Sequence, residues 1–432
     1  MIGLTLFALF AVLLLGGAPI GVALGFGGVV AIAWANAEAP WFGLLAAPQN
    51  MQAGIAKYPL LALPMFVLVG TIFDRSGVAQ RLVDFALACV GRSPGTLPMV
   101  AVLVAMLLGG ISGSGPATAA AVGAVILVAM ARAGYPPPFS ASVVGSAAAL
   151  DIVIPPSIAL VVYSVLVPGA SVPAMFAAGI FPGILAGVAL IVPVLWLSRR
   201  RGYGAAESSL PRPPFWRSLA RAAWGLAAPV LILGGMRVGW FTPTEAAVVA
   251  VVYGLFVGMV VHRTIGLRDL YGIFRDAAET SSVIMIVMAL AGIFAYSVST
   301  LGLADPLVHA VQAANLGSTG VLLACLAILL VVGMVLDGVS IFLIFLPLLY
   351  PLMLLYRWDP VWFGILLTMM VAIGQFTPPM AVNLMVACRL AGVRMEQTLP
   401  HVGWLVLGFS VATLIVAFFP EIALWLPRSL GY

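Results

Sequence analysis

Apolar stretches follow one another along most of this chain and are separated by short polar loops. A transmembrane helix needs about 20 mainly apolar residues to cross a hydrocarbon core roughly 30 Å thick, and these stretches match that length. Only 8% of the 432 residues are charged, against about 25% in a typical soluble domain, so a soluble fold would have a mostly apolar surface. The sequence therefore predicts an all-α polytopic protein embedded in a lipid membrane.

The stretches predict about ten transmembrane helices, at residues 2–17, 20–35, 60–75, 138–166, 174–198, 222–238, 243–262, 280–300, 360–388 and 402–424. Two further apolar regions, 98–131 and 320–354, have polar, small-residue centres at 109–116 and 337–340. The arms of the first region, about 12 and 15 residues, would reach roughly 18 and 22 Å, which is short of the hydrocarbon core. We therefore expect each region to be a re-entrant helical hairpin with its tip in mid-membrane.

The basic residues predict how these segments are oriented. If the N-terminus is outside and each hairpin returns to the side it left, the inner loops hold 15 of the 19 Lys and Arg residues. The positive-inside rule favours this topology, with both termini outside. The arginines form no helix face interleaved with aromatic residues, so nucleic-acid binding is not expected. The three Cys and three His residues are far apart in sequence and predict no transition-metal site.

Four landmarks of the first half recur in the second half at a nearly constant spacing. The pairs are Pro19 and Pro243, Gly77 and Gly302, Pro155 and Pro378, and the hairpin tips Ser112 and Asp337, at offsets of 223 to 225 residues. Residues 1–198 and 222–432 would then be two repeats of five spans and one hairpin each, joined by a basic cytoplasmic linker at 199–221. Because five is odd, the second repeat must be inverted in the membrane. Inverted repeats of this kind are typical of secondary transporters.

In each half a proline pair interrupts the span that follows the hairpin, at 154–156 and 377–379. Proline frees backbone carbonyls, which are tolerated in the hydrocarbon core only where they line a cavity or bind something. The tips would bring Ser112, Ser114 and Thr118 to the first break, and Asp337 and Ser340 to the second. These oxygens predict two related sites for a dehydrated monovalent cation, and the helix N-termini at the breaks favour an anion.

Asp151 and Asp337 are the two carboxylates that we expect deep in the membrane, where burying an acid is costly and usually functional. No His is expected near either of them, so an intramembrane enzyme is disfavoured. Paired hairpins and inverted repeats favour alternating access over a passive channel. No ATPase motif occurs in the chain, which agrees with an ion gradient as the energy source.

In their order and spacing, several short motifs resemble the large membrane subunit of the tripartite ATP-independent periplasmic (TRAP) transporters, over nearly the whole chain. The motifs are Pro64-Met65-Phe66, Ser112-Gly113-Ser114 followed by Ala117-Thr118-Ala119-Ala120-Ala121, Ile154-Pro155-Pro156-Ser157, Pro243-Thr244-Glu245-Ala246-Ala247, Asp337, Gly374, Thr377-Pro378-Pro379 and Asn383-Leu384. The resemblance implies an elevator-type transporter, similar in fold to the ion transporter superfamily, in the bacterial inner membrane with both termini periplasmic. It implies no enzyme activity and no cofactor, with Na⁺ as the coupling ion for uptake of a small organic acid. It also implies two partners, a small four-helix membrane subunit and a periplasmic substrate-binding protein.

The resemblance also assigns site residues. A first sodium site would use Ser112, Ser114, Asp151, Ile154 and Pro156, and a second would use Asp337, Gly338, Gly374, Thr377 and Met380. Thr118, Ser157, Ser340 and Asn383 would lie near the substrate.

The chain departs from the family pattern at three places. Gly115-Pro116 stands where a second serine is usual in the tip, Ala381 where glycine follows the second proline pair, and Asp151 where glycine is usual. Asp151 could ligate sodium directly, or it could exchange a proton for the ion, and the sequence leaves both interpretations open. A stand-alone sodium–dicarboxylate symporter of similar architecture, needing no binding protein, is the main alternative function.

Overall fold

The computed structural model describes residues 2–38, 43–91, 93–207 and 213–432, and these ranges contain helices and turns without a strand. Within them, eight helices are long and apolar enough to cross a membrane, or nine if one bent pair is counted as a single span. The predicted all-α polytopic fold is therefore confirmed. The inverted arrangement of two repeats stays a prediction, although the order of hairpin, broken helix and long helix does occur twice along the chain.

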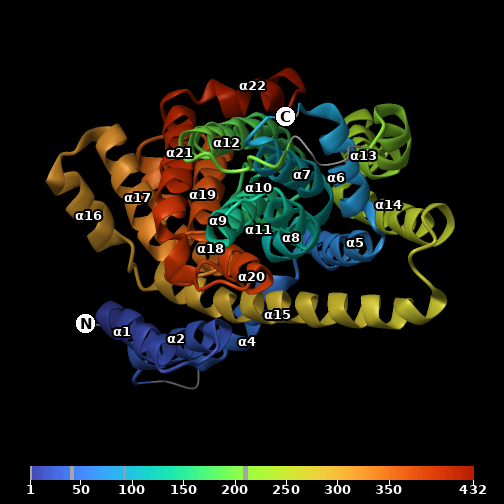
Figure 1. The fold of residues 1–432 in the computed structure, drawn as a ribbon. Helices are drawn as coiled ribbons and strands as arrows, with labels where there is room; N and C mark the ends of the chain where they lie inside the picture. Colours follow the sequence, from blue (N-terminus) through green and yellow to red (C-terminus); the bar gives the residue numbers. More distant parts are fainter. Residues whose placement is uncertain (1, 39–42, 92, 208–212) are drawn as a thin grey trace.

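The peripheral helices lie along one long helix. α15 (Leu267–Thr300) runs along the lower edge of the molecule in Figure 1, with α1 (Ile2–Leu15), α2 (Ile20–Ala35) and α4 (Ala46–Ile55) gathered at one end of it. α2 approaches α15 closely because Gly21, Gly25 and Gly28 lie on its contact face, against Val287, Leu290 and Ile293. Small residues at such spacing let membrane helices pack backbone to backbone. At the other end of α15 lie α5 (Ala62–Arg75), α13 (Phe215–Val238) and α14 (Pro243–Phe256), and the Arg75 guanidinium pairs with Asp276 of α15.

The first hairpin and the broken helices of the two halves lie together at the centre, and α17 of the second hairpin lies to the left of them, beside α16 (Figure 1). The first half supplies α7 (Thr96–Ser112), α8 (Gly115–Arg132), α9 (Pro137–Ala148), α10 (Leu150–Val153) and α11 (Ile158–Leu166). The second half supplies α17 (Gly317–Gly333), α18 (Gly338–Leu355), α19 (Pro360–Gly374) and α20 (Val382–Ala391). α20 packs on α8 and α9, and α19 packs on α10, so the halves interlock instead of lying side by side.

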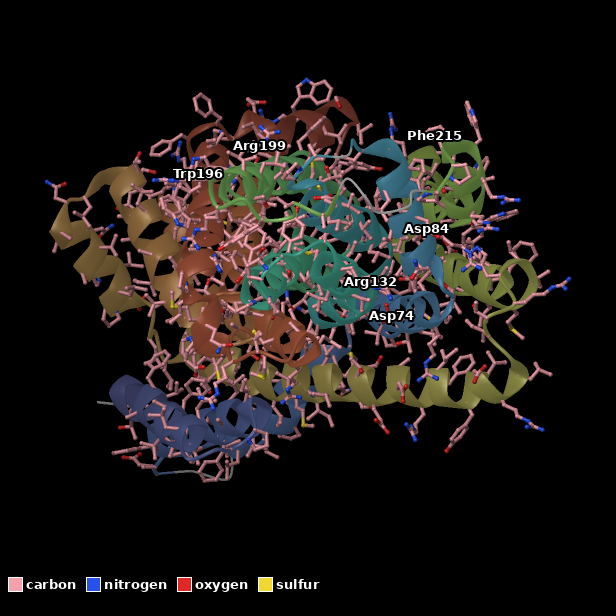
Figure 2. The ribbon with its side chains drawn as sticks, in the orientation of Figure 1. Asp74, Asp84, Arg132, Trp196, Arg199 and Phe215 are labelled. Carbon is pink, nitrogen blue, oxygen red and sulfur yellow. The ribbon has the colours of Figure 1, made fainter. Side chains whose placement is uncertain are left out.

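α12 (Val172–Arg200) covers this central group together with α21 (Leu399–Phe418) and α22 (Glu421–Ser429). Trp196 and Arg199 near the end of α12 lie at the upper edge of the molecule in Figure 2. Three short helices of 10–12 residues, α4, α6 (Val78–Cys89) and α16 (Asp305–Ala314), were not expected from the sequence. They are too short to span a membrane, so a search for spanning stretches misses them.

The hairpin arms are longer than the sequence analysis expected. α7 has 17 residues and α8 has 18, so an arm reaches about 27 Å instead of roughly 18 to 22 Å. The predicted tip at 109–116 shrinks to Gly113 and Ser114, because Gly109 and Gly110 remain helical where α7 packs tightly on Asp151 and Pro229. Arm length therefore does not distinguish these hairpins from spanning pairs, and their re-entrant course stays a prediction.

The linker is also shorter than the predicted range 199–221. α12 continues to Arg200, and α13 begins at Phe215 directly after two prolines. Residues 208–212, with Arg212, and Arg92 of the predicted inner loops lie outside the described residues. The described part of the linker is anchored by Glu207, which is 1% exposed and accepts hydrogen bonds from the Leu97 backbone N–H (2.6 Å) and the Tyr135 hydroxyl (2.5 Å). A linker carboxylate thus caps the N-terminus of α7.

Candidate functional site

The tip of the first hairpin lies directly on the first proline break. Gly113 has a left-handed φ of 66°, and a Cβ at this position would lie 3.1 Å from the Pro156 carbonyl oxygen. On the other side of the tip, a Cβ at Gly70 of α5 would lie 2.8 Å from the Ser112 carbonyl oxygen. Two glycines therefore let the tip approach the break on one side and α5 on the other at backbone distance.

Asp151 reaches this tip from the broken helix. α10 places it in the interior with 0% exposure. Its Oδ1 accepts a hydrogen bond from the Gly113 backbone N–H (3.2 Å), and its Oδ2 accepts one from the Thr118 hydroxyl (3.0 Å). Asp151 therefore joins the break, the tip and the first turn of α8.

The remaining oxygens of the predicted first site fit a bound cation. The Ser112 hydroxyl is buried and has no hydrogen-bond partner among the described residues. A hydroxyl left without a partner in the interior is unfavourable unless something absent from the protein itself satisfies it. The Ser157 hydroxyl, by contrast, is used locally, because it donates to the Ile152 carbonyl at 2.6 Å. Ile154 and Pro156 enter the site through their backbones at the end of α10.

The second tip is built around Asp337, which caps α18. Its carboxylate accepts hydrogen bonds from the backbone N–H groups of Val339 (3.1 Å) and Ser340 (3.3 Å) and from the Ser340 hydroxyl. Asp337 is exposed, whereas Asp151 is fully buried. The sequence placed both acids deep in the membrane, and the structure shows that their surroundings differ.

The second tip also touches the second proline break. The Met380 backbone N–H donates to the Met334 carbonyl at 3.0 Å, and Gly374 of α19 packs against the backbone of Gly333. Gly338 lies against Val371, and the Thr377 hydroxyl donates to the Ile373 carbonyl at 2.6 Å. The Met380 side chain is 47% exposed, so its place in the predicted site rests on its backbone.

The departure at Ala381 has a structural counterpart. Ala381 adopts a φ of 41°, a left-handed conformation that glycine enters without steric cost. The break keeps the backbone shape that glycine would favour even though the residue is alanine.

Both sites place a negative charge at the start of the second hairpin helix, which aligning the two halves of the sequence does not reveal. In each hairpin a carboxylate lies at the N-terminus of the second helix, where the helix dipole is positive. Asp337 provides it from within the second tip, and Asp151 provides it to the first tip from the neighbouring broken helix. Asp151 thus supplies the charge that the first tip, made of Gly and Ser, lacks.

Asn383 brings the second half to the first tip. It is fully buried on α20, and neither its Oδ1 nor its Nδ2 has a hydrogen-bond partner among the described residues. A Cβ at Gly115 would lie 2.6 Å from Nδ2, so the amide lies beside the start of α8. The side chains of Thr118, Ser157 and Ser340, by contrast, are already hydrogen bonded. Of the four residues predicted near the substrate, Asn383 is the one with free polar atoms.

The sequence analysis missed a cavity on the periphery. A cavity of about 580 Å³ lies among α4, α11, α15 and α18, and Lys57, Asp305 and Tyr350 are among its lining residues. The Lys57 ammonium donates to the Val165 carbonyl at 2.9 Å, and burial lowers the pKa of this lysine. The sequence feature that could have drawn attention to this region is Lys57, the single lysine of the chain. No predicted ion-site residue lines this cavity.

Gly374→Ala tests the docking of the second tip. The added Cβ would overlap the Gly333 backbone, which cannot move aside as a flexible side chain can, so we expect a loss of about 1–3 kcal/mol of stability. Thermal unfolding of the purified protein in detergent measures this. Gly234→Ala is the control, because nothing lies within 4 Å of its added Cβ, and an unchanged or higher Tm is expected there. Equal Tm values for both variants would contradict the close approach.

An all-helical membrane domain with two helical hairpins, each docked on a broken helix, defines a multi-pass transporter. The family model described as "Tripartite ATP-independent periplasmic transporter, DctM component" matches residues 7–422. The chain therefore belongs to the TRAP transporter large permease family and is a multi-pass inner-membrane protein.

Curated relatives agree with this assignment. The C4-dicarboxylate TRAP transporter large permease protein DctM of Pseudomonas aeruginosa is 38% identical over 87% of each chain. The sialic acid TRAP transporter large permease protein SiaM of Vibrio cholerae is 32% identical over 97% of each chain. The isethionate TRAP transporter permease protein DctMQ of Oleidesulfovibrio alaskensis is 34% identical over 97% of this chain, which spans 65% of that relative's length.

Solved structures share the fold at low sequence identity. The YdaH transporter of Alcanivorax borkumensis aligns with a TM-score of 0.60 at 15% identity, over 89% of this chain and 90% of that one. MtrF of Neisseria gonorrhoeae aligns with a TM-score of 0.58 at 10% identity, over 88% and 85% of the two chains. At these identities the likeness concerns the fold alone.

Proposed function

We propose that this chain is the membrane permease of a sodium-driven importer that takes up a small organic acid. The observation that carries the proposal is the pair of docked hairpin tips. Each tip lies at a proline break, and each has a carboxylate at the N-terminus of its second helix. Carboxylate, carbonyl and hydroxyl oxygens are hard ligands suited to a small hard cation.

The substrate class is supported by the relatives and by the helix ends. The names of the relatives specify C4-dicarboxylates, sialic acid, isethionate and 2,3-diketo-L-gulonate, all of them organic acids. The two unpartnered polar atoms of Asn383 lie beside the N-terminus of α8, where a cation bound with Asp151 would offset the negative charge of that carboxylate. Asn383 and this helix end therefore form our candidate contact for a substrate carboxylate, next to the first cation site.

The proposed mechanism is an elevator movement of the central hairpins and broken helices against the periphery. The cavity of about 580 Å³ lined by residues of both α15 and α18 supports this proposal, because it leaves unfilled space at the boundary even though the two helices also contact each other. The central helices of the two halves instead interlock through α20 and α8, so they can move as one body.

The proposed partners follow from the family. A small four-helix membrane subunit and a periplasmic substrate-binding protein would work with this chain, and the binding protein would select the acid. The stand-alone symporter is the less favoured reading, because the chain belongs to a family whose description includes three components.

Reconstitution tests the energy source. We expect proteoliposomes containing the chain and both partners to accumulate one of the acids named above only under an inward sodium gradient. Equal sodium on both sides should give equilibration only, and ATP should make no difference. Accumulation without a sodium gradient, or accumulation that requires ATP, would refute the proposal. Uptake that persists without the binding protein would instead support the stand-alone symporter.

A further inference from the structure

A second polar cavity lies away from the hairpins, on the peripheral side of the molecule. It has a volume of about 560 Å³, opens to the surface, and is lined by α6, α13 and the end of the helix formed by α14 and residues Val257–Val261. Its lining residues include Arg81, Asp84, Arg221, Trp224 and His262. Figure 2 labels Asp84 on α6, on the side of the molecule where α13 and α14 lie. The proposed ion and substrate sites use none of these residues.

The cavity concentrates positive charge. Burial lowers the pKa of Arg81, the nearby charge of Arg221 lowers it further, and the charge of Asp84 offsets part of this effect. The Arg81 Nη1 is held in place by donating to the Gly77 carbonyl at 2.7 Å. Two guanidinium groups facing one cavity repel each other unless an anion lies between them.

His262 supplies a polar atom that lacks a partner. Its Nδ1 lies 3.0 Å from the Ser76 carbonyl oxygen and therefore carries the proton of that hydrogen bond. Its Nε2 is buried and has no hydrogen-bond partner among the described residues. With its proton on Nδ1, the neutral ring has an accepting lone pair on Nε2, so Nε2 could donate to a ligand oxygen only in the imidazolium form, which a bound anion favours.

The location favours a lipid. The distribution of arginines predicts that this side faces the cytoplasm, and basic pockets between transmembrane helices on that side bind lipid head groups. Trp224 is 41% exposed at the rim, and its indole packs on Phe256 with ring centroids 6.0 Å apart. Tryptophan is enriched at the level of the head groups. The rim thus combines an aromatic surface for the glycerol and acyl region with a basic interior.

We propose that the cavity lined by Arg81, Arg221 and His262 binds the phosphate group of an anionic phospholipid. The two guanidinium groups would hold the phosphate oxygens, and His262 Nε2 would donate to one of them, because the bound anion favours the protonated ring. Binding would tie α6 to α13 and to the end of α14, and so would stabilise this part of the periphery. The inference does not depend on the coupling ion or on the transported solute.

Native mass spectrometry of the delipidated full chain in detergent tests the site, with phosphatidylglycerol as the probe. An arginine near the membrane surface contributes roughly 1 kcal/mol to binding an anionic lipid, or about fivefold in affinity. We therefore expect the double variant Arg81→Gln/Arg221→Gln to bind phosphatidylglycerol about 25-fold more weakly. Arg268→Gln on exposed α15 removes the same charge outside the cavity, so it should lower the affinity less than the loss of either cavity arginine does. Asp84→Asn should tighten binding, because it removes the negative charge from the cavity.

If the double variant does not fold, the affinity of Asp84→Asn for phosphatidylglycerol still tests the proposal. An affinity for phosphatidylglycerol that is unaffected by Asp84→Asn, or by the arginine changes in a folded protein, would overturn the proposal. Phosphatidylcholine and inorganic phosphate are the comparison ligands. Inorganic phosphate that binds in place of phosphatidylglycerol, and is lost in the double variant, would assign the cavity to a soluble phosphate and would overturn the lipid assignment.

Discussion

Asp337→Asn is expected to reduce sodium-driven uptake by about a hundredfold or more while the protein still inserts and folds. Asparagine caps a helix N-terminus about as well as aspartate, so the hydrogen bonds from Val339 and Ser340 can persist. The substitution removes the negative charge, which leaves the positive end of α18 facing any cation at the tip. Uptake by reconstituted protein and the Tm in detergent separate these two effects.

The chain contains a matched control for this experiment. Asp359 caps α19 in the same way, accepting hydrogen bonds from the backbone N–H groups of Val361 (2.9 Å) and Trp362 (3.2 Å), but it lies outside the hairpin tip. Asp359→Asn should leave both uptake and sodium dependence within about twofold, because Asn preserves the cap. Wild-type uptake with unchanged sodium dependence in Asp337→Asn would show that the charge of Asp337 has no part in coupling.

The sequence was sufficient to predict the helical membrane fold and the contact between tips and breaks, for identifiable physical reasons. Long apolar stretches have few alternatives to transmembrane helices, and each proline pair marks its own break. The backbone contacts of Gly113 with Pro156 and of Met380 with Met334 show both tips at the expected breaks. Short helices such as α6 could not be predicted in this way, because a segment of that length is hard to distinguish in the sequence from an ordinary loop.

What the sequence could not predict is how the two halves interlock. Nothing in the local pattern indicates that Asn383 of α20 lies beside Gly115 of the first hairpin. The same limit applies to Glu207, whose carboxylate caps α7 from a linker distant in sequence. Both contacts depend on the packing of elements more than a hundred residues apart, which a single sequence does not specify.

Asp151→Gly is expected to retain uptake but to raise the sodium concentration needed for half-maximal rate by about tenfold to a hundredfold. The variant restores the family pattern at this position and keeps the carbonyl oxygens of Ser112 and Pro156 near the tip. It removes the buried carboxylate that accepts hydrogen bonds from Gly113 and Thr118. Losing a charged, buried partner costs roughly 1.4–3 kcal/mol, which corresponds to the expected range of affinity.

Uptake measured against sodium at two pH values, in the wild type and in Asp151→Gly, distinguishes the two roles of this carboxylate. Direct ligation predicts a shifted sodium dependence in the variant at both pH values. Proton exchange predicts instead a pH dependence that the wild type has and the variant lacks. Ser146→Ala is the control, since Ser146 is buried on α9 and bonds only within its own helix, to Val143. If wild type and Asp151→Gly behave alike under all four conditions, Asp151 is a structural link between tip and break and contributes nothing to the ion.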